Sequence, residues 1–468
     1  MGALSLTGLA QSRPNIIFFM VDDMGIGDLG AYGQRYIPTP ALDSLAQAGM
    51  TFTQAYAGCS VSAPSRGSLL TGRHTGHAFI RGNKDTANAD GHTYDHPLAD
   101  DEVTIAEMLR DAGYDTACIG KWGLGGPGTE GAPTRQGFDY FFGYLGQLNA
   151  HRHRPEFLHE GETLIPLDGK TYAQDLLMDH AIDFLRDRKR RERPFFLYFT
   201  PALPHADLDA EEADRKPFEG AFCERPFEGN WYRAEAQPKA TYAGMIRRID
   251  RDVRRMIEVL REEGLAEETL FIFTSDNGPH EEGGHDPYFF DGNGPYRGLK
   301  RALYEGGVRV PFIAVWPGVI KPGSTSYHVL AFWDVMPTLR ELSGAAPQEQ
   351  SDGISFAPTL IGRGEQAEHQ YLYWEFHEEG GRQAVRMGQW KLIRQQVRDA
   401  SQTYEELFNI FADPGELRDV STDYPEVVRQ LGELIDRSHR PSKDFPLLPQ
   451  EDLCKMVFRR KSTAFSAG

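Results

Sequence analysis

The strongest constraint on the fold of this chain is a set of four short apolar runs. Each run is followed within a few residues by charged, amide or imidazole side chains. They are residues 15–21, 115–119, 195–200 and 270–274. Continuous apolar runs of this length are typical of strands buried on both faces of a parallel sheet. Amphipathic helical patterns lie between them, and the longest repeats apolar residues at helical spacing over 245–260. The alternation predicts an α/β fold in which helices sandwich a mostly parallel sheet.

The sequence pattern changes near residue 366, where short strand-like runs joined by turns begin, and this change divides the chain. We expect a catalytic α/β domain over 15–365 and a smaller α+β domain over 366–468, with an antiparallel sheet and a helix at 425–438. The polar, charged segment 207–239 predicts a surface insertion. Residues 1–14 are small and weakly apolar, which fits either a signal-peptide remnant or an unstructured leader.

Composition excludes several classes of protein. The chain has 468 residues, of which 40% are hydrophobic, enough for a large core. A net charge of −18 argues against general binding of nucleic acid or membrane surfaces. No apolar run approaches the length of a membrane span. The four cysteines show neither metal-ligand spacing nor a disulfide framework.

Chemically reactive side chains gather after the predicted strands. Asp22 and Asp23 follow the first run, Asp276 and Asn277 follow the last, and Lys121 and His205 follow the other two. Sites in open α/β sheets lie beyond the carboxyl ends of the strands. Carboxylate and amide oxygens select a hard cation, and this flexible mixture suits Ca²⁺, with Mg²⁺ as the alternative. The sequence shows no His/Cys cluster that argues for zinc.

The stretch Ser62 to Arg73 reads Ser-Ala-Pro-Ser-Arg-Gly-Ser-Leu-Leu-Thr-Gly-Arg. Pro64 predicts the start of a helix, with Ser62 at or just before its N-terminus, where negative charge is favoured. Arg66 adds a fixed cation one turn further on. At every defined position the stretch resembles the sulfatase signature, (Cys or Ser)-x-Pro-Ser-Arg-x-x-x-Leu-Thr-Gly-Arg.

Further motifs support this resemblance in the same order as in the family. The chain is similar to type I, formylglycine-dependent sulfatases, which have an alkaline-phosphatase-like fold, from about residue 14 to 320 and more loosely to the C-terminus. The matching positions are the aspartate pair Asp22 and Asp23, Gly-Lys-Trp at 120–122, His205, Asp276-Asn277, and Lys-x-x-x-Tyr-Glu-Gly-Gly at 300–307.

The resemblance implies hydrolysis of a sulfate ester, expected to be an O-sulfate on a carbohydrate. Residue 62 would be oxidised to formylglycine, whose hydrated aldehyde attacks sulfur. One divalent cation would be held by Asp22, Asp23, Ser62, Asp276 and Asn277. Lys121, Lys300 and Arg66 would neutralise charge on sulfate. His205 would protonate the leaving alcohol.

Two departures from the family pattern bear on activity. Most members carry Cys at the first signature position, whereas this chain carries Ser62. It is therefore either a serine-type sulfatase matured by its own modifying enzyme or a Cys-to-Ser variant that keeps its substrate intact. Many sulfatases also read Gly-Lys-Trp-His, but Gly123 stands at that last position. The work of that histidine would fall to His205, a lysine or His280.

Histidine-rich loops are the candidate substrate contacts. We expect His74, His77, His153, His280 and His285 to bind substrate. Their motifs look more like those of bacterial sulfatases acting on sulfated glycans than those of lipid or steroid sulfatases. If residues 1–14 are a signal-peptide remnant, we expect a periplasmic or secreted location in a bacterium.

Two other functions stay open at this point. One is a phosphatase or phosphodiesterase of the same superfamily that uses unmodified Ser62 and two zinc ions. The other is a non-catalytic protein that binds sulfated glycans. The sugar, the sulfate position, endo or exo action and the oligomeric state do not follow from the sequence.

Overall fold

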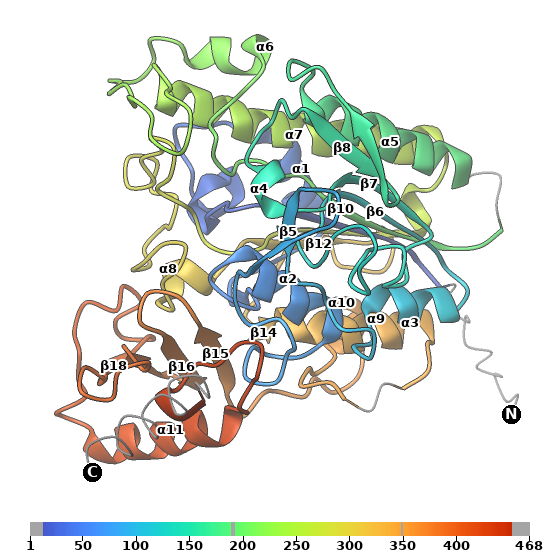
Figure 1. Cartoon of the computed structure of the whole chain (residues 1–468). Helices are drawn as coiled ribbons and strands as arrows, with labels where there is room; N and C mark the ends of the chain where they lie inside the picture. Colours follow the sequence, from blue (N-terminus) through green and yellow to red (C-terminus); the bar gives the residue numbers. More distant parts are fainter. Residues whose placement is uncertain (1–12, 189–191, 348–349, 452–468) are drawn as a thin grey trace, which may run out of the picture.

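The computed structural model describes residues 13–188, 192–347 and 350–451, so the leader prediction lies outside the described residues except for positions 13 and 14. A ten-stranded mixed sheet forms the centre of the molecule (Figure 1). Its strands, in spatial order, are β13 (Ser324–Ser326), β2 (Met50–Phe52), β12 (Phe312–Val315), β11 (Thr269–Ser275), β1 (Asn15–Val21), β10 (Phe195–Thr200), β6 (Asp115–Lys121), β7 (Tyr140–Tyr144), β8 (Phe157–Glu160) and β9 (Thr163–Pro166).

The middle of the sheet is parallel. Strands β11, β1, β10, β6 and β7 run in one direction, and β1 lies between β11 and β10. The expected strand near residues 310–316 forms β12, which pairs antiparallel with β11. The predicted α/β class, with a mostly parallel sheet at its core, is confirmed.

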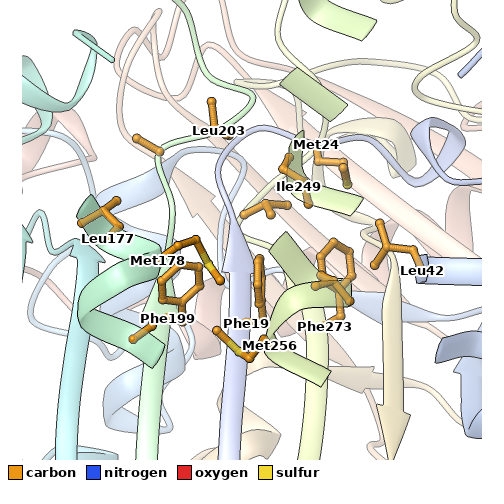
Figure 2. Close-up of a cluster of buried hydrophobic side chains, with 14 of the residues drawn as sticks. Phe19, Met24, Leu42, Leu177, Met178, Phe199, Leu203, Ile249, Met256 and Phe273 are labelled. Carbon is orange, nitrogen blue, oxygen red and sulfur yellow. The ribbon is translucent and has the colours of Figure 1, made fainter. Parts of the chain in front are cut away.

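Helices cover both faces of the sheet because β1 is apolar on both. Ile17, Phe19 and Val21 pack into one core, whereas Ile16, Phe18 and Met20 pack into the other. Figure 2 shows the first core, where Phe19 lies near Phe199 and Met256. Its helices are α1 (Pro40–Ala48), α5 (Ala173–Arg188) and α7 (Pro238–Glu262); the opposite face carries α2 (Ser62–Thr71), α3 (Ile105–Asp111), α9 (Val335–Ser343) and α10 (Ala357–Ile361).

A second, smaller sheet lies near the C-terminus, as expected (Figure 1). Its antiparallel strands are β15 (Leu372–Phe376), β16 (Arg382–Met387), β17 (Trp390–Gln395) and β18 (Tyr404–Asn409). Helix α11 (Pro425–Ser438) packs against it through Leu431 and Ile435. Shorter elements are β3 (Ala55–Tyr56), β4 (Asp85–Ala87), β5 (Thr93–Asp95), β14 (Leu330–Ala331), α4 (Gln147–Ala150), α6 (Glu212–Arg215) and α8 (Glu305–Val308).

Segment 207–239 is more than a surface insertion. Leu208 and Phe218 join the core beneath α7, and Asp207 and Asp214 are buried. Its rim is exposed, since Trp231 keeps 55% of its surface. Polar composition hid the apolar anchors, which are too few to form a periodic pattern. Among the described residues, no helix is long and apolar enough to cross a membrane.

A buried ion cluster joins the small sheet to the large one. Lys391 on β17 has no exposed surface, and its Nζ lies 2.9 Å from Glu305 Oε1 and 3.3 Å from Glu416 Oε1. Glu305 belongs to α8, in the segment that connects β11 to β12 of the large sheet. A buried ion cluster tolerates the loss of one partner poorly, because the remaining charges stay uncompensated.

We therefore expect Lys391→Met to lower the free energy of unfolding by about 3–5 kcal/mol. Urea denaturation followed by circular dichroism measures this change. The matched control is Lys321→Met, at an exposed lysine, which should change stability by no more than about 0.5 kcal/mol. Equal stabilities of the two variants would contradict the assigned importance of the cluster.

Candidate active site

The strand register brings the acidic residues together. Val21 on β1 pairs with Ser275 on β11, so Asp22 and Asp23 leave the sheet beside Asp276 and Asn277. The backbone N–H of Asp23 donates to Asp276 Oδ1 at 3.1 Å. All four side chains are buried. The site thus follows from strand order and register, as expected for the carboxyl ends of parallel strands.

Ser62 is the first residue of α2 and lies against this cluster. Its Oγ donates to Asp22 Oδ1 at 2.9 Å, and Lys121 Nζ donates to Ser62 Oγ at 3.1 Å. Lys121 Nζ also contacts Asp22 Oδ2 at 2.7 Å. Burial opposes ionisation of Asp22, but Lys121, His205 and Arg66 together hold its pKa well below the usual range. The hydroxyl therefore sits between a carboxylate and an ammonium at a helix N-terminus.

The helix begins earlier than Pro64 suggests. Its first residue is Ser62, so the proline stands at the third position, where its missing N–H is still tolerated. The N–H of the intervening Ala63 points to Asn83 Oδ1 at 3.4 Å.

Arg66 holds the cluster rather than facing outward. Its Nε and Nη2 donate to Asp276 Oδ2 at 3.2 and 3.0 Å, and its Nη1 donates to the Lys121 carbonyl at 2.8 Å. The side chain has no exposed surface. Arg66 thus joins α2 to the ends of β11 and β6, and every one of these bonds is directed at the protein itself.

The acidic cluster has the properties of a cation site. Asp22, Asp23 and Asp276 can each place a carboxylate oxygen within 4.8 Å of the other two. Asn277 donates to Asp23 Oδ1 at 2.7 Å, but its own Oδ1 is buried and has no hydrogen-bond partner. Burial and the nearby Asp22 carboxylate raise the pKa of Asp276 to about 7. An orphaned oxygen and crowded carboxylates fit a hard divalent cation.

His205 and Lys300 form the opposite side of the cluster. Lys300 Nζ lies 2.8 Å from Asp23 Oδ2, 2.9 Å from His205 Nε2 and 3.0 Å from Glu282 Oε2. His205 Nδ1 contacts the Ala206 carbonyl at 2.5 Å, so the N–H lies on Nδ1 and Nε2 accepts from Lys300. Burial, with Lys300 nearby, lowers the pKa of His205 well below its usual value.

Three of the expected substrate histidines are engaged in contacts within the protein, on or near the loop that carries His205. His153 is buried, and its Nε2 contacts the His205 carbonyl at 2.8 Å. His280 uses both ring nitrogens, since Nε2 contacts the Pro204 carbonyl at 3.0 Å and Nδ1 accepts from Glu282 N–H at 3.0 Å. His285 is buried and stacks on Tyr242 with ring centroids 3.5 Å apart. These contacts make them supports of the His205 loop.

The other two, His74 and His77, are separated from the cluster. They follow the far end of α2, and its ten residues span about 15 Å. His77 Nδ1 contacts Asp352 Oδ1 at 2.8 Å, and the His74 ring packs edge-on against Tyr373 of β15. His74 Nδ1 also accepts from Gly76 N–H at 3.2 Å. Their place is between α2 and the small sheet.

His151 is a site residue that sequence reasoning missed. Its ring stacks flat on His205, with centroids 4.5 Å apart and planes inclined by 9°. Its Nδ1 is buried and has no hydrogen-bond partner. Sequence analysis assigns His153, from the same His-Arg-His-Arg loop at 151–154, to the substrate. The path of the loop backbone decides whether His151 or His153 stacks on His205, and the sequence pattern does not reveal that path.

Gly123 stands where many sulfatases carry a histidine, and its surroundings favour a small residue. Its φ of +77° favours glycine, and a Cβ there would lie 3.3 Å from Gln147 Cγ and 3.8 Å from Asp95 Oδ2. Gln147 Nε2 donates to Asp95 Oδ1 at 2.6 Å and to Asn83 Oδ1 at 3.2 Å. A glutamine–aspartate pair therefore occupies the region beside this glycine.

Comparisons with known proteins agree with this geometry. The sulfatase family model matches residues 14–345, and the model "N-sulphoglucosamine sulphohydrolase, C-terminal" matches residues 296–440. N-acetylgalactosamine-6-sulfatase of Canis lupus familiaris is 30% identical over 96% of this chain and 91% of its own length. Arylsulfatase A of Homo sapiens is 34% identical over 82% of this chain and 75% of its own.

Solved structures give the same result. The crystal structure of Ps i-CgsB in complex with k-i-k-neocarrahexaose superposes with a TM-score of 0.77 at 26% identity, covering 96% of this chain and 98% of that one. The fold is shared with sulfatases, and the relatives show that the chain is a sulfuric ester hydrolase. The chain belongs to the sulfatase family, whose members use a metal ion and a formylglycine nucleophile.

The contacts of Arg66 lead to a prediction about turnover. Arg66→Ala leaves Asp276 unpaired in a buried cluster, so we expect kcat to fall by about 100-fold or more in protein that carries the family's nucleophile. The dissociation constant for substrate should change by less than about threefold. Steady-state kinetics and calorimetry measure the two quantities. The control is Arg73→Ala, a half-buried arginine just beyond α2 that pairs with Glu102. Weakened binding with unchanged kcat would instead assign Arg66 to the substrate.

Proposed function

We propose that this sulfatase hydrolyses O-sulfate esters of carbohydrates. The observation that carries the proposal is Ser62 Oγ, held by Asp22 and Lys121 at the N-terminus of α2, beside a cation site. Two relatives support the substrate class: one is an N-acetylgalactosamine-6-sulfatase, and the other is Ps i-CgsB with a bound neocarrahexaose.

Residue 62 is the proposed nucleophile position, with formylglycine as its active form. The hydrated aldehyde supplies a nucleophilic hydroxyl and a second hydroxyl through which sulfate is later released. Lys121 Nζ, 3.1 Å from Ser62 Oγ, is placed to hold an oxygen there and to stabilise negative charge on it. Asp22 Oδ1 lies 2.9 Å from the same oxygen. It accepts the hydrogen bond that the hydroxyl donates and so fixes the orientation of the hydroxyl.

The proposed cation is Ca²⁺, held by Asp22, Asp23, Asp276, Asn277 and the oxygen of residue 62. When bound, it supplies a Lewis acid that draws charge from a sulfate oxygen. The donor set consists of oxygen atoms only, which suits Ca²⁺ and, less well, Mg²⁺. The unpartnered Asn277 Oδ1 is the donor that nothing else in the described residues uses.

The proton for the leaving alcohol is assigned to the His205–Lys300 pair. Lys300 donates to His205 Nε2 over 2.9 Å, so the two side chains share whatever proton the pair carries. His205 Nδ1 stays bonded to the Ala206 carbonyl, which keeps Nε2 directed at the cluster. The sequence analysis assigned this proton to His205 alone, but the Nε2 of His205, which faces the cluster, carries no N–H to donate.

The two alternative functions receive less support. A phosphatase with two zinc ions needs histidine ligands, but both ring nitrogens of His280, which lies near Asp23 and Glu282, are engaged elsewhere. A phosphonate monoester hydrolase of Agrobacterium radiobacter shares the fold at 20% identity, which concerns the fold alone. A non-catalytic glycan-binding protein would need neither the Asp22 carboxylate nor the Lys121 ammonium beside Ser62.

A periplasmic or secreted location and a maturation enzyme for Ser62 belong to the proposal.

The first test concerns residue 62. With unmodified Ser62 the protein should bind sulfated sugars but turn them over at a negligible rate, because a sulfated serine has no easy route to release sulfate. Ser62→Cys, made in a host that converts only cysteine, should gain sulfatase activity on sulfated mono- and disaccharides. Mass spectrometry of the residue 62 peptide establishes its oxidation state. The control is Ser68→Cys, which lies within the signature at a position where any residue is allowed. Multiple turnovers by verified unmodified Ser62 would overturn the mechanism.

The second test concerns the cation. Calorimetric titration of metal-free protein should show one Ca²⁺ bound more tightly than Mg²⁺, with a rise in melting temperature. Asp276→Asn should weaken Ca²⁺ binding by at least about tenfold, whereas Asp399→Asn, at an exposed aspartate of the small sheet's loop, should not. Unchanged affinity in Asp276→Asn, or two zinc ions per chain, would refute the calcium assignment.

A further inference from the structure

An exposed tryptophan lies one ring away from His205, a member of the proposed proton-donating pair. Trp231 keeps 55% of its surface exposed, and its ring packs edge-on against His151 with centroids 4.9 Å apart and planes inclined by 88°. His151 in turn stacks flat on His205. Trp231 is therefore only one ring removed from His205, although it comes from the 207–239 segment and His151 comes from a separate loop.

Tyr232 continues this group toward the cluster. Its ring is perpendicular to Trp231, with centroids 5.0 Å apart, and lies 5.8 Å from His151. Burial, with Glu282 nearby, raises the pKa of Tyr232 above its ordinary value, so its hydroxyl stays protonated. The three rings thus form one aromatic corner at the rim of the site, which we call the aromatic corner (His151, Trp231 and Tyr232).

A buried carboxylate fixes the aromatic corner from below. Asp207 is 2% exposed; its Oδ1 accepts from Arg233 N–H at 2.9 Å, and its Oδ2 pairs with Arg152. Arg152 follows His151, and Arg233 follows Tyr232. One aspartate therefore holds both loops in register, which indicates a preorganised surface rather than two loosely packed loops.

The chemistry of the aromatic corner matches a sugar ring. A pyranose presents an apolar C–H face bordered by hydroxyls, and such a face packs on an indole while the hydroxyls seek donors and acceptors. The polar groups on the two neighbouring rings are the buried, unpartnered Nδ1 of His151 and the hydroxyl of Tyr232, which interacts with Glu282. Burial lowers the pKa of His151, so its ring is neutral and offers one donor and one acceptor.

We propose that the aromatic corner is the subsite that binds the sugar ring of the substrate, with Trp231 as the stacking platform and His151 and Tyr232 as hydroxyl contacts. This inference rests on the proposed function, because it places the carbohydrate of that same reaction. It assigns specificity to the 207–239 segment, which lies outside the sulfate-binding cluster.

Binding to the unmodified Ser62 protein tests the subsite without catalysis. The probes are sulfated disaccharides from chondroitin and heparin, titrated calorimetrically. Trp231→Ala should weaken the tightest of them by about tenfold, and Trp231→Phe should restore part of the loss because it keeps a ring. Tyr404→Ala is the matched control, since Tyr404 is 53% exposed on β18 of the small sheet. Equal affinities for Trp231→Ala and the parent protein overturn the subsite.

Kinetics of the active form separate this inference from the proposed function. In the Ser62→Cys background with verified formylglycine, Trp231→Ala should raise KM for the sulfated sugar about tenfold and leave kcat and inhibition by inorganic sulfate unchanged. If the parent is active and KM does not move, the subsite is refuted while the function stands. If the parent hydrolyses only aryl sulfates, the carbohydrate assignment and the subsite both fail. If it hydrolyses no sulfate ester, the function fails and the binding experiment alone decides the subsite.

Discussion

The Arg66–Asp276 ion pair is the interaction on which the site depends. Three carboxylates, those of Asp22, Asp23 and Asp276, converge where β1 and β11 end, and burial alone would make that arrangement unfavourable. Arg66, one turn after Ser62 on α2, reaches Asp276, so compensating the charge also positions the helix. Ser62, four residues earlier, is thereby held against Asp22. Electrostatic compensation and placement of the nucleophile position are one and the same structural feature.

The surrounding charges are balanced with little left over. The four buried or half-buried carboxylates of the site meet four cationic side chains: Asp22, Asp23, Asp276 and Glu282 against Arg66, Lys121, Lys300 and Arg301. A sulfate ester is itself an anion, and the whole chain carries a net charge of −18. A bound divalent cation would give the site the positive charge that such a substrate needs. The charge balance thus supports the same proposal as the unpartnered Asn277 oxygen.

Much of the fold could be predicted because its strands are buried on both faces. The runs at 15–21 and 195–200 match β1 and β10 at both ends, and helix 425–438 matches α11. The cluster was predictable for a related reason: strand ends carry Asp22, Asp276 and Lys121 to one edge. What the sequence could not place depends on loops and distance. Helical rise carries His74 away from Ser62, and the path of one loop turns His151, instead of His153, toward His205.

The departure at Gly123 shows how the site can differ from the family pattern without losing a histidine. A side chain at 123 would crowd Gln147, and the left-handed backbone there favours glycine, so the position disfavours a larger residue. His151 enters from the loop that follows α4, the helix that begins with Gln147. The same short helix therefore occupies the region beside Gly123 and delivers an imidazole to His205. Because that imidazole also contacts Trp231, it connects His205, a member of the proposed proton-donating pair, to the 207–239 segment. In this chain the residues next to the reacting group and the residues expected to recognise the sugar form one packed unit.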